Sequence, residues 1–560
     1  MNMLHRPEQK PEAILQRSPK WDILPEDFYC NHEVQSRSVK DGLMYEVDHW
    51  HPECPVLIEA QTGLGKTTFV YEELIPRALA QKKNVLIISN RIALSVQQKI
   101  KLMKKNKDPR LEMLSDLGIQ KCEDFGAIRI ITYHRLHALL KDEKLTKWRD
   151  QLLYVVADEA HFFTSDALFN RYCGAILWDI TKCFERAIRV YLTATSWDVL
   201  KPLGDAELNS HSDFLNRVIG KNMVYRQFHR YIFPFDYSAY TLQFVSKLED
   251  LTTCIQQNRK EKWLVFCNSK DKGKTFATSL GNLADYIDAE VKEEKEKKEV
   301  WQKLVKDEQF EKQVLVTTAV LDCGVNIHDE SVKNIVVCAD NRTSLLQMVG
   351  RKRLAPQEKV SVWIVEPNSQ ALSARAKKYE KQLELIQQFE YLKTPKKQAS
   401  FLNRLLENSD PSDNVLFYVS RTQPFGQNKG SLEVRKNELA EYAIRRRKAF
   451  LDKLTSGKTT FQKEVNNWFG KTTEDSVDTL ERLEEFYQAN EGKVISQEQI
   501  PILRKLIVDL YRESGYKEPQ KTRIGTLGVD ALNNRLEKIP NASYHIEETP
   551  EKEWKLVRND

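Results

Sequence analysis

Short apolar runs rich in valine and isoleucine recur through the first two thirds of the chain and alternate with longer, helix-like stretches. Each run has four to six residues and is apolar on both faces, as expected of strands buried between two layers of helices. The runs are Val56–Ala60, Val85–Ser89, Ile128–Thr132, Leu152–Ala157, Arg189–Leu192, Trp263–Cys267, Val314–Thr317, Asn334–Cys338 and Val360–Val365. The alternation predicts an α/β protein with two parallel sheets in tandem.

The spacing of these runs divides the 560 residues into five segments. An irregular lead-in that contains four prolines is expected over residues 1–45. The first α/β unit is expected at 46–205, a connector at 206–235 and the second α/β unit at 236–370. From 371 to 560 the strand pattern stops and helix-like patterns dominate, which predicts a separate, mainly helical accessory region.

Two segments of the accessory region have the pattern of amphipathic helices, namely Glu438–Leu454, with a basic face, and Ile502–Glu513. Near the end, Ser543–Glu547 and Trp554–Arg558 flank a stretch that contains a proline, and this arrangement predicts a β-hairpin. Helices followed by a hairpin are typical of a winged-helix-like module, but also of many domains that bind a partner protein. The sequence leaves both interpretations open.

Composition narrows the class of protein. The formal net charge of +6 permits nucleic-acid binding without requiring it. Nine cysteines without a Cys-x-x-Cys pair indicate a reducing compartment, so a cytoplasmic location is expected. The chain does not start like a secretion signal and has no apolar stretch of about 18 residues, so no membrane insertion is expected.

Two groups of potential metal ligands lie close together in the sequence. Cys30 is followed by His32, and His49 and His51 are followed by Cys54. Their spacings match no standard zinc finger. We therefore expect no metal at either group.

The strongest local motif is AQTGLGKT at 60–67, which follows one apolar run and precedes the helix-like run Thr68–Ala80. A loop with glycines at such a place can wrap its backbone N–H groups around phosphates. Lys66 would neutralise the β- and γ-phosphates of ATP, and the Thr67 hydroxyl would hold Mg²⁺. The predicted nucleotide-binding residues of this loop are Ala60, Gln61, Thr62, Gly63, Leu64, Gly65, Lys66 and Thr67.

A second motif ends the apolar run Leu152–Ala157 with two adjacent carboxylates, Asp158 and Glu159. Asp158 is predicted to hold Mg²⁺, and Glu159 to polarise the water that attacks the γ-phosphate. A pair of acidic residues after a strand is also found in simple surface turns. The phosphate-binding loop about ninety residues upstream favours the catalytic interpretation.

Together the two motifs resemble motifs I and II of helicase superfamily 2, and Asp-Glu-Ala-His at 158–161 resembles its DEAH-box members. Further segments resemble the other motifs of this superfamily in the same order. They are Ser89–Arg91 (Ia), Ile131–Leu136 (Ib), Thr193–Thr195 (III), Trp263–Lys270 (IV), Thr317–Ile327 (V) and Gln347–Arg353 (VI). The resemblance implies two RecA-like lobes that hydrolyse ATP between them and move along nucleic acid.

In this resemblance, motif VI of the second lobe supplies Arg351 and Arg353, which are expected to reach the γ-phosphate when the lobes close. The second arginine is usual one residue later, where this chain has Leu354. The form found here is similar to that of viral and plasmid origin-binding helicases, and it leaves open which arginine acts. Gln347 and His161 are implied to lie at the lobe interface and to sense the nucleotide.

The resemblance also implies contacts for motif V and for nucleic acid. Gly324 and Asn326 are expected to contact the nucleotide, although an aspartate is more common at position 326. Nucleic-acid backbone contacts are expected from loops that follow strands. The candidates are Arg91, Thr132, Arg135, Ser269, Lys270 and Thr318. The same residues would also suit helix capping or ordinary surface charge, and the sequence does not decide between these roles.

The function that the sequence favours is an ATP-dependent DNA helicase or translocase with Mg²⁺ as cofactor. The preference for DNA follows from the likeness of motif VI to that of origin-binding helicases. An RNA helicase is the nearest alternative. A second class is the motor subunit of a restriction or defence complex, which would bind a partner nuclease, with the accessory region as the place to look for the partner. A scaffold without activity is disfavoured because the catalytic residues are all present.

Overall fold

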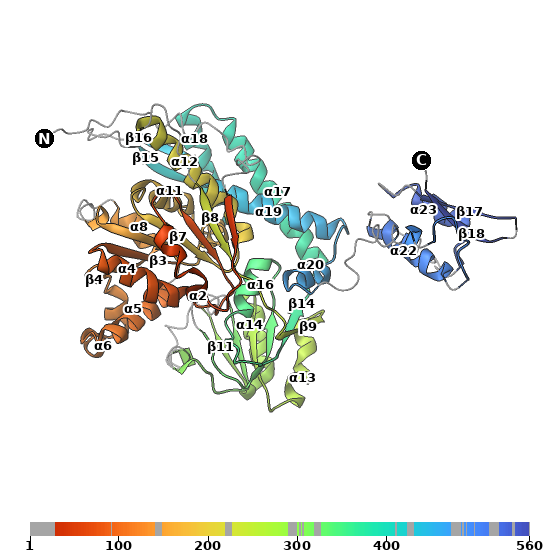
Figure 1. Cartoon of the computed structure of the whole chain (residues 1–560), viewed down its shortest axis with the longest axis horizontal. Helices are drawn as coiled ribbons and strands as arrows, with labels where there is room; N and C mark the ends of the chain where they lie inside the picture. Colours follow the sequence, from red (N-terminus) through yellow and green to blue (C-terminus); the bar gives the residue numbers. More distant parts are fainter. Residues whose placement is uncertain are drawn as a thin grey trace. The chain divides into compact units, whose positions relative to one another are not determined.

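The structure is a computed structural model of the chain, shown in Figure 1. It describes residues 29–558 except for 91, 141–147, 219–226, 289–299, 302–303, 305–306, 319–325, 409–410, 423–430, 472–482, 484–485, 489, 498, 514–525, 540–543 and 551. The chain divides into two compact units. The first consists of Met1–Thr241, Leu248–Trp363 and Lys381–Arg445, and the second of Leu242–Lys247, Ile364–Glu380 and Arg446–Asp560.

An eight-stranded sheet forms the centre of what we call the first lobe, with strand order β1-β8-β2-β7-β6-β3-β5-β4. Its strands are β1 (Tyr29–Glu33), β2 (Val56–Glu59), β3 (Asn84–Ser89), β4 (Asp124–Phe125), β5 (Ile128–Thr132), β6 (Leu152–Ala157), β7 (Ile188–Thr193) and β8 (Phe228–Ile232). All neighbours pair in parallel except β4 and β5. The five apolar runs predicted as parallel strands in this part of the chain are confirmed.

Helices cover both faces of this sheet (Figure 1). The main ones are α2 (Val39–Leu43), α3 (Lys66–Phe69), α4 (Ile75–Ala80), α5 (Ile92–Asn106), α8 (Tyr133–Leu139), α10 (Phe162–Ser165), α11 (Cys173–Cys183) and α12 (Leu200–Val218). Phe69 and Leu102 pack with Val56 and Val190 on one face, while Tyr191 faces α12 on the other. Burial on both faces explains why the strands are apolar throughout rather than alternating.

The first lobe is larger than we expected. Residues 29–45, which we expected to be irregular, contain β1 and α2, and the expected connector at 206–235 contains most of α12 and all of β8. The strands β1 and β8 pair with each other in parallel, with Tyr29 opposite Phe228. Their sequences, YCNHE and FHRYI, carry charged residues and histidines; β1 lies at the edge of the sheet, and β8 is next to it, between β1 and β2. The search for valine-rich and isoleucine-rich runs therefore missed them.

A six-stranded sheet forms the second lobe, with strand order β11-β12-β10-β13-β14-β9. Its strands are β9 (Tyr240–Val245), β10 (Lys262–Phe266), β11 (Ala284–Ile287), β12 (Val314–Thr317), β13 (Val332–Val337) and β14 (Val360–Val365). The pairs β10–β12, β10–β13 and β11–β12 are parallel. The helices α13 (Thr252–Gln257), α14 (Lys270–Leu280) and α16 (Arg342–Val349) accompany them. The predicted second α/β unit is confirmed.

Helices α17 (Ser369–Glu390), α18 (Pro395–Asn408) and α19 (Glu438–Thr455) follow the second sheet. Between α18 and α19 lies an antiparallel hairpin of β15 (Phe417–Thr422) and β16 (Ser431–Lys436), which we did not predict. Asn437 comes directly after β16, and its side-chain amide donates to the carbonyls of Ala167 (3.2 Å) and Asn170 (3.4 Å). This part of the accessory region is thus anchored to the first lobe.

The last part of the chain has a small core of its own, built by α22 (Ile500–Glu513), α23 (Val529–Leu536) and a hairpin of β17 (Tyr544–Glu548) and β18 (Trp554–Arg558). The two helices predicted in the accessory region correspond to α19 and α22, and the predicted hairpin is present with antiparallel pairing. Among the described residues, no helix has both the length and the apolar character needed to cross a bilayer.

A fully buried ion pair joins the first sheet to α12. Arg189 of β7 and Glu207 of α12 have no exposed side-chain surface, and the Nε of Arg189 lies 2.7 Å from the Oε1 of Glu207. The guanidinium also donates to the backbone carbonyls of Ala187 (2.7 Å) and Pro52 (2.9 Å), and the Tyr191 hydroxyl donates to Glu207 (2.7 Å). Each charge therefore depends on the other for its compensation inside the lobe.

Replacing Glu207→Ala would leave the Arg189 charge buried without its counter-ion. We expect the free energy of unfolding to fall by about 3–5 kcal/mol. The matched control is Glu72→Ala, because Glu72 pairs with Lys40 at 2.8 Å on the surface, where water compensates the loss. Urea unfolding followed by circular dichroism would measure both variants. Equal, small effects for the two variants would contradict the structural role of the buried pair.

Candidate active site

The loop between β2 and α3 has the strand–loop–helix context that the sequence predicted for phosphate binding. The backbone of Gly63 has a φ of 100° and that of Gly65 a φ of 83°, values that favour glycine over any residue with a side chain. The N–H of Ala60 donates to the Thr193 carbonyl of β7 at 3.1 Å, and the Leu64 N–H donates to Gln61 at 3.2 Å. The loop is thus fixed at its base and turned back on itself.

Lys66 starts α3 and is buried. Its ammonium group donates to the carbonyls of Ala60 (2.6 Å) and Gln61 (3.3 Å), both in the same loop. Burial lowers the pKa of Lys66, and the negative charges of Glu159 and Asp158 act in the opposite direction. The amine is therefore held over the phosphate-binding loop, within electrostatic reach of both acidic residues.

Asp158 follows β6, is buried and accepts several hydrogen bonds. Its Oδ2 accepts from the side-chain amide of Gln98 (2.8 Å), and its Oδ1 accepts from the Glu159 N–H (3.0 Å). The Tyr133 hydroxyl donates to its backbone carbonyl at 2.9 Å. Burial, together with the neighbouring charge of Glu159, raises the pKa of Asp158 to about 7. Neither Gln98 nor Tyr133 had a sequence signal for this role, because each reaches Asp158 from another helix.

Glu159 adopts an unusual backbone conformation, with a φ of 51°. A positive φ is strained for a residue with a side chain, and such strain clusters at functional sites. The Oε2 of Glu159 lies 3.4 Å from the Nδ1 of His161. Burial acts to raise the pKa of Glu159, but the positive charges of His161, Lys66 and Arg351 lower it overall. The carboxylate is therefore kept ionised in a partly buried position, as a group that accepts a proton requires.

His161 also connects this site to the end of β7. Its Nδ1 lies 3.5 Å from the Thr193 hydroxyl, which in turn accepts from the Thr195 N–H at 3.0 Å. Just beyond, the Thr343 hydroxyl at the start of α16 donates to Asp198, and the Arg342 guanidinium lies 3.5 Å from the ring centre of Trp197. These two contacts between the lobes were not predicted from the sequence, because neither falls within a motif.

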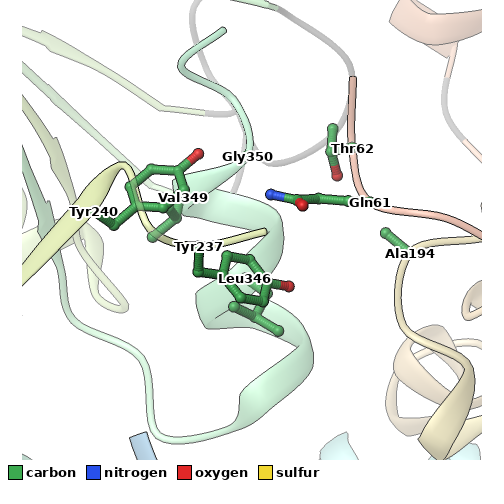
Figure 2. Close-up of a pocket in the computed structure, with 8 residues that line it drawn as sticks. All are labelled: Gln61, Thr62, Ala194, Tyr237, Tyr240, Leu346, Val349 and Gly350. Atoms are coloured by element: carbon green, nitrogen blue, oxygen red, sulfur yellow. The ribbon is translucent and has the colours of Figure 1, made fainter. Parts of the chain in front are cut away.

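The segment after α16 lies directly on the phosphate-binding loop. A Cβ atom on Gly350 would be only 3.0 Å from the Thr62 hydroxyl, so a side chain at position 350 would fit only if its neighbours shifted by a few tenths of an ångström. Figure 2 shows Gln61 and Thr62 of the loop facing Val349 and Gly350. A pocket at this place is lined by Gln61, Thr62, Ala194, Tyr237, Tyr240, Leu346, Val349 and Gly350.

Gln61 also ties the phosphate-binding loop to the segment that leads to the second lobe. Its amide nitrogen donates to the Asp236 carbonyl at 3.0 Å, and its amide oxygen accepts from the Asp236 N–H at 2.9 Å. Both halves of the side-chain amide are therefore used to hold one residue of the passage between β8 and β9.

Of the two motif VI arginines, Arg351 is buried and Arg353 is half-buried, and they have different partners. The guanidinium of Arg351 donates to the Gln347 side chain at 3.1 Å, and that of Arg353 donates to the Asn326 side chain at 3.0 Å. Burial and the charge of Arg351 lower the pKa of Arg353 to about 10, while Glu159 acts in the opposite direction. Both arginines also act on the pKa of Lys66, which places them in the same charged cluster.

Several polar atoms of this cluster are buried without a hydrogen-bond partner in the described structure. They are the Oε2 of Glu159, the Nε2 of Gln347, the Nε of Arg351 and the Nη1 of Arg353. Such atoms are costly unless a ligand satisfies them. Unpaired arginine N–H groups beside a glycine loop, with carboxylates opposite, fit a polyphosphate accompanied by a divalent cation.

The structure therefore brings together most residues predicted for catalysis. Lys66, Asp158, Glu159 and His161 from the first lobe share one charged cluster with Gln347, Arg351 and Arg353 from the second. Thr67 is in the first turn of α3, beside Lys66. The side chain of Asn326 accepts a hydrogen bond from Arg353, a contact that we did not expect. Gly324 and most of motif V lie outside the described residues.

The residues predicted to contact nucleic acid follow the strands β5, β10 and β12. The Thr132 hydroxyl accepts from the Arg135 N–H at 3.3 Å, and Arg135 pairs with Glu123 at 2.7 Å. The Ser269 hydroxyl caps α14. These contacts are those of helix capping and surface pairing, so the nucleic-acid roles of Thr132, Arg135, Ser269, Lys270 and Thr318 stay predictions. Arg91 lies outside the described residues.

Two family models match the chain in tandem. The model described as "Type III restriction enzyme, res subunit" matches residues 32–197, and the model described as "Helicase conserved C-terminal domain" matches residues 246–353. The matches fall on the first and the second lobe in the expected order. The chain belongs to helicase superfamily 2. Helicase domains of this superfamily imply nucleotide binding and ATP hydrolysis. The assignment to the DEAH-box subgroup stays a prediction.

Solved structures of other superfamily 2 helicases resemble the chain. Dbp5 from S. cerevisiae, bound to RNA and ADP BeF3, is 14% identical over 57% of this chain and 82% of its own, with a TM-score of 0.40. Lhr from Mycobacterium smegmatis, bound to ssDNA and AMP-PNP, is 16% identical over 61% and 47%, with a TM-score of 0.42. MrfA bound to DNA is 14% identical over 73% and 55%, also with a TM-score of 0.42.

No curated protein matches the sequence of this helicase. The assignment to superfamily 2 rests on the two family models and on the arrangement of the motifs, not on likeness to individual structures.

The contact between Gly350 and Thr62 provides a test of the lobe interface. Gly350→Ala would force Thr62 or motif VI to shift by a few tenths of an ångström. We expect turnover to fall, by less than the roughly 100-fold that a misplacement of about 1 Å causes. The matched control is Gly174→Ala, because the nearest atom to a Cβ there lies 4.0 Å away, in ordinary contact. ATP hydrolysis by both variants would be measured beside their melting temperatures. Unchanged turnover in Gly350→Ala would show that this contact is not needed for catalysis.

Proposed function

We propose that this superfamily 2 helicase hydrolyses ATP between its two lobes and uses their closure to move along DNA. The observation that carries the proposal is the placement of motif VI on the phosphate-binding loop, with Gly350 against Thr62. Through this contact the arginines of one lobe share a charged cluster with Lys66 and Glu159 of the other. A site divided in this way is completed only while the lobes are closed, which links hydrolysis to motion.

Each residue of the cluster has a role in the proposal. The backbone N–H groups of the loop and the amine of Lys66 bind the β- and γ-phosphates. Thr67 and Asp158 would hold Mg²⁺, and the ion would supply positive charge for the phosphate oxygens. Glu159 orients the attacking water and takes up its proton, because it is ionised and partly buried. His161 holds the Glu159 carboxylate in place and connects it to the Thr193 hydroxyl.

Arg353 is the better candidate for the arginine that contacts the γ-phosphate. Its Nη1 lies 3.7 Å from the position of a Cβ on Gly63, in the phosphate-binding loop, and has no protein partner in the described structure. Arg351 instead uses one N–H group on Gln347. In the proposal, Asn326 positions Arg353, and Gln347 positions Arg351. Gly324 and Asn326 also lie near the nucleotide in this scheme.

The preference for DNA has two supports. The form of motif VI is similar to that of origin-binding helicases, and the family model that matches the first lobe is described as a restriction enzyme subunit. The same description favours a second candidate function, in which the chain is the motor of a restriction or defence complex and a partner protein is the nuclease. The accessory region, anchored to the first lobe through Asn437, would carry the partner. The cysteine usage supports a cytoplasmic location.

The proposal is tested by the rate of ATP hydrolysis without nucleic acid and with single-stranded DNA, double-stranded DNA or RNA. We expect DNA to stimulate hydrolysis, and Glu159→Gln to abolish at least about 99% of the stimulated rate, since this residue acts on the attacking water. Glu123→Gln is the control, because Glu123 is a surface partner of Arg135 and lies outside the charged cluster.

The pattern of stimulation separates the alternatives. Stimulation by RNA alone would overturn the preference for DNA and retain the mechanism. Activity that requires a co-purifying protein would favour the restriction motor. Hydrolysis that persists in Glu159→Gln would refute the assignment of the catalytic residue.

A pH dependence follows from the pKa of Asp158, which is raised to about 7. The protonated acid cannot hold Mg²⁺, so the apparent Mg²⁺ affinity is expected to be constant above pH 7 and to fall up to about tenfold per pH unit below it. Glu159→Gln removes a neighbouring negative charge that raises this pKa, so the fall should begin at a lower pH. Asp158→Asn should remove the part of this pH dependence of the Mg²⁺ affinity that comes from Asp158.

Mg²⁺ titrations in the presence of a non-hydrolysable ATP analogue, on both sides of pH 7, would measure these profiles. The phosphates of the analogue also take up protons in this pH range. The decisive result is therefore the difference among the wild type, Glu159→Gln and Asp158→Asn. Profiles of the same shape in all three would contradict the assignment of Asp158 as a Mg²⁺ ligand.

A further inference from the structure

A second cluster of reactive side chains lies at the outer edge of the first sheet. Cys30 and His32 are two residues apart on β1, so their side chains lie on the same face of the sheet. Cys30 pairs with His229 of the neighbouring strand β8. From the sequence we expected no metal at Cys30 and His32, because their spacing matches no standard zinc finger. The third ligand comes from a strand about 200 residues later.

The three side chains converge closely. The Nε2 of His32 lies 3.1 Å from the Nδ1 of His229. The Sγ of Cys30 and one ring nitrogen of each histidine all lie within 4.8 Å of one another, and all three residues are half-buried. In a tetrahedral zinc site, with Zn–N near 2.0 Å and Zn–S near 2.3 Å, ligand atoms are about 3.3–3.7 Å apart. Side-chain movements of about 1 Å would close the cluster on a metal ion.

Ring stacking orients the two imidazoles. The ring of His32 stacks on that of Tyr231, with centroids 4.6 Å apart, and the Tyr231 hydroxyl accepts from the Trp50 indole at 3.0 Å. The ring of His229 stacks on that of His32, with centroids 5.2 Å apart. The stacked rings therefore hold their nitrogens beside the Cys30 thiol.

We propose that Cys30, His32 and His229 bind one Zn²⁺ ion that ties β1 to β8. A thiolate with two imidazoles is a donor set that suits zinc, and three protein ligands leave one position for water. In the described part of the chain, no other group of three such side chains lies this close together. The proposed site is independent of the ATP site, since it uses none of the residues assigned to hydrolysis.

The position of the site indicates its role. The strand β1 is at the edge of the sheet and pairs only with β8. Beyond β8 the chain passes through Asp236, which Gln61 holds by two hydrogen bonds, to β9 in the second lobe. A metal shared by β1 and β8 would therefore fix the edge of the first lobe at the strand from which the chain crosses to the second lobe. The ion is structural in this proposal.

The test uses the full chain purified without chelators. Metal analysis should find one zinc ion per chain, and Cys30→Ser or His229→Ala should lower the zinc affinity at least about 100-fold, so that little zinc is retained. Cys254→Ser is the matched control, because Cys254 is also half-buried but lies in the second lobe. It should keep its zinc. Wild-type protein without zinc, or equal zinc in the wild type and Cys30→Ser, would overturn the proposal.

A second measurement covers the case in which the variants do not fold. Wild-type protein is stripped with a chelator, checked by circular dichroism and titrated with Co²⁺. We expect a sulfur-to-cobalt charge-transfer band that saturates at one equivalent, and a melting temperature that rises when Zn²⁺ is added. The absence of the band in folded protein would mean that His32 and His229 form a hydrogen-bonded pair and nothing more, which would overturn the proposal.

Discussion

The parallel order of the first sheet is the constraint on which the rest of the molecule depends. The strands β2, β7, β6 and β3 are neighbours and run in the same direction, so their carboxyl ends lie at one edge. The phosphate-binding loop, the Asp158–Glu159 pair and the Thr193–Thr195 segment all begin at that edge. Functional loops gather there in any open parallel sheet. The active site is thus a consequence of strand order, and the individual side chains refine it.

The charged cluster at this edge is costly to the folded chain. Lys66 and Asp158 are buried, Glu159 is partly buried, and Arg351 and Arg353 add positive charge from the other lobe. Burial moves the pKa values of several of these groups away from their usual range, and some of their polar atoms have no partner in the described structure. Charges in such a place interact strongly because little water screens them. The arrangement that destabilises the protein without a ligand is suited to binding a polyphosphate.

Several contacts between the two lobes have a clear physical basis. A Cβ atom on Gly350 would lie only 3.0 Å from the Thr62 hydroxyl, and Thr343 donates to Asp198 in the segment after β7. Gln61 holds the crossing segment at Asp236. Contacts of this kind can open and close without disrupting either core. The strand β8, after which the chain crosses to the second lobe, also pairs with the edge strand β1 at the cysteine–histidine cluster.

The sequence by itself determined the two sheets and the chemical groups of the active site. Buried parallel strands such as Val85–Ser89 are continuously apolar, and the loop at 60–67 and the Asp158–Glu159 pair have fixed local spacings, so a single chain segment is enough to recognise each. Tertiary structure alone decided the rest. The edge strand β1 and its neighbour β8 have polar sequences, and their pairing joins residues about 200 apart in the chain. Gln98 reaches Asp158 across 60 residues of the chain, Asn326 reaches Arg353 across 27, and His229 reaches His32 across 197. No local pattern encodes these contacts, because they depend on the order of strands in the sheets and on the packing of one lobe against the other.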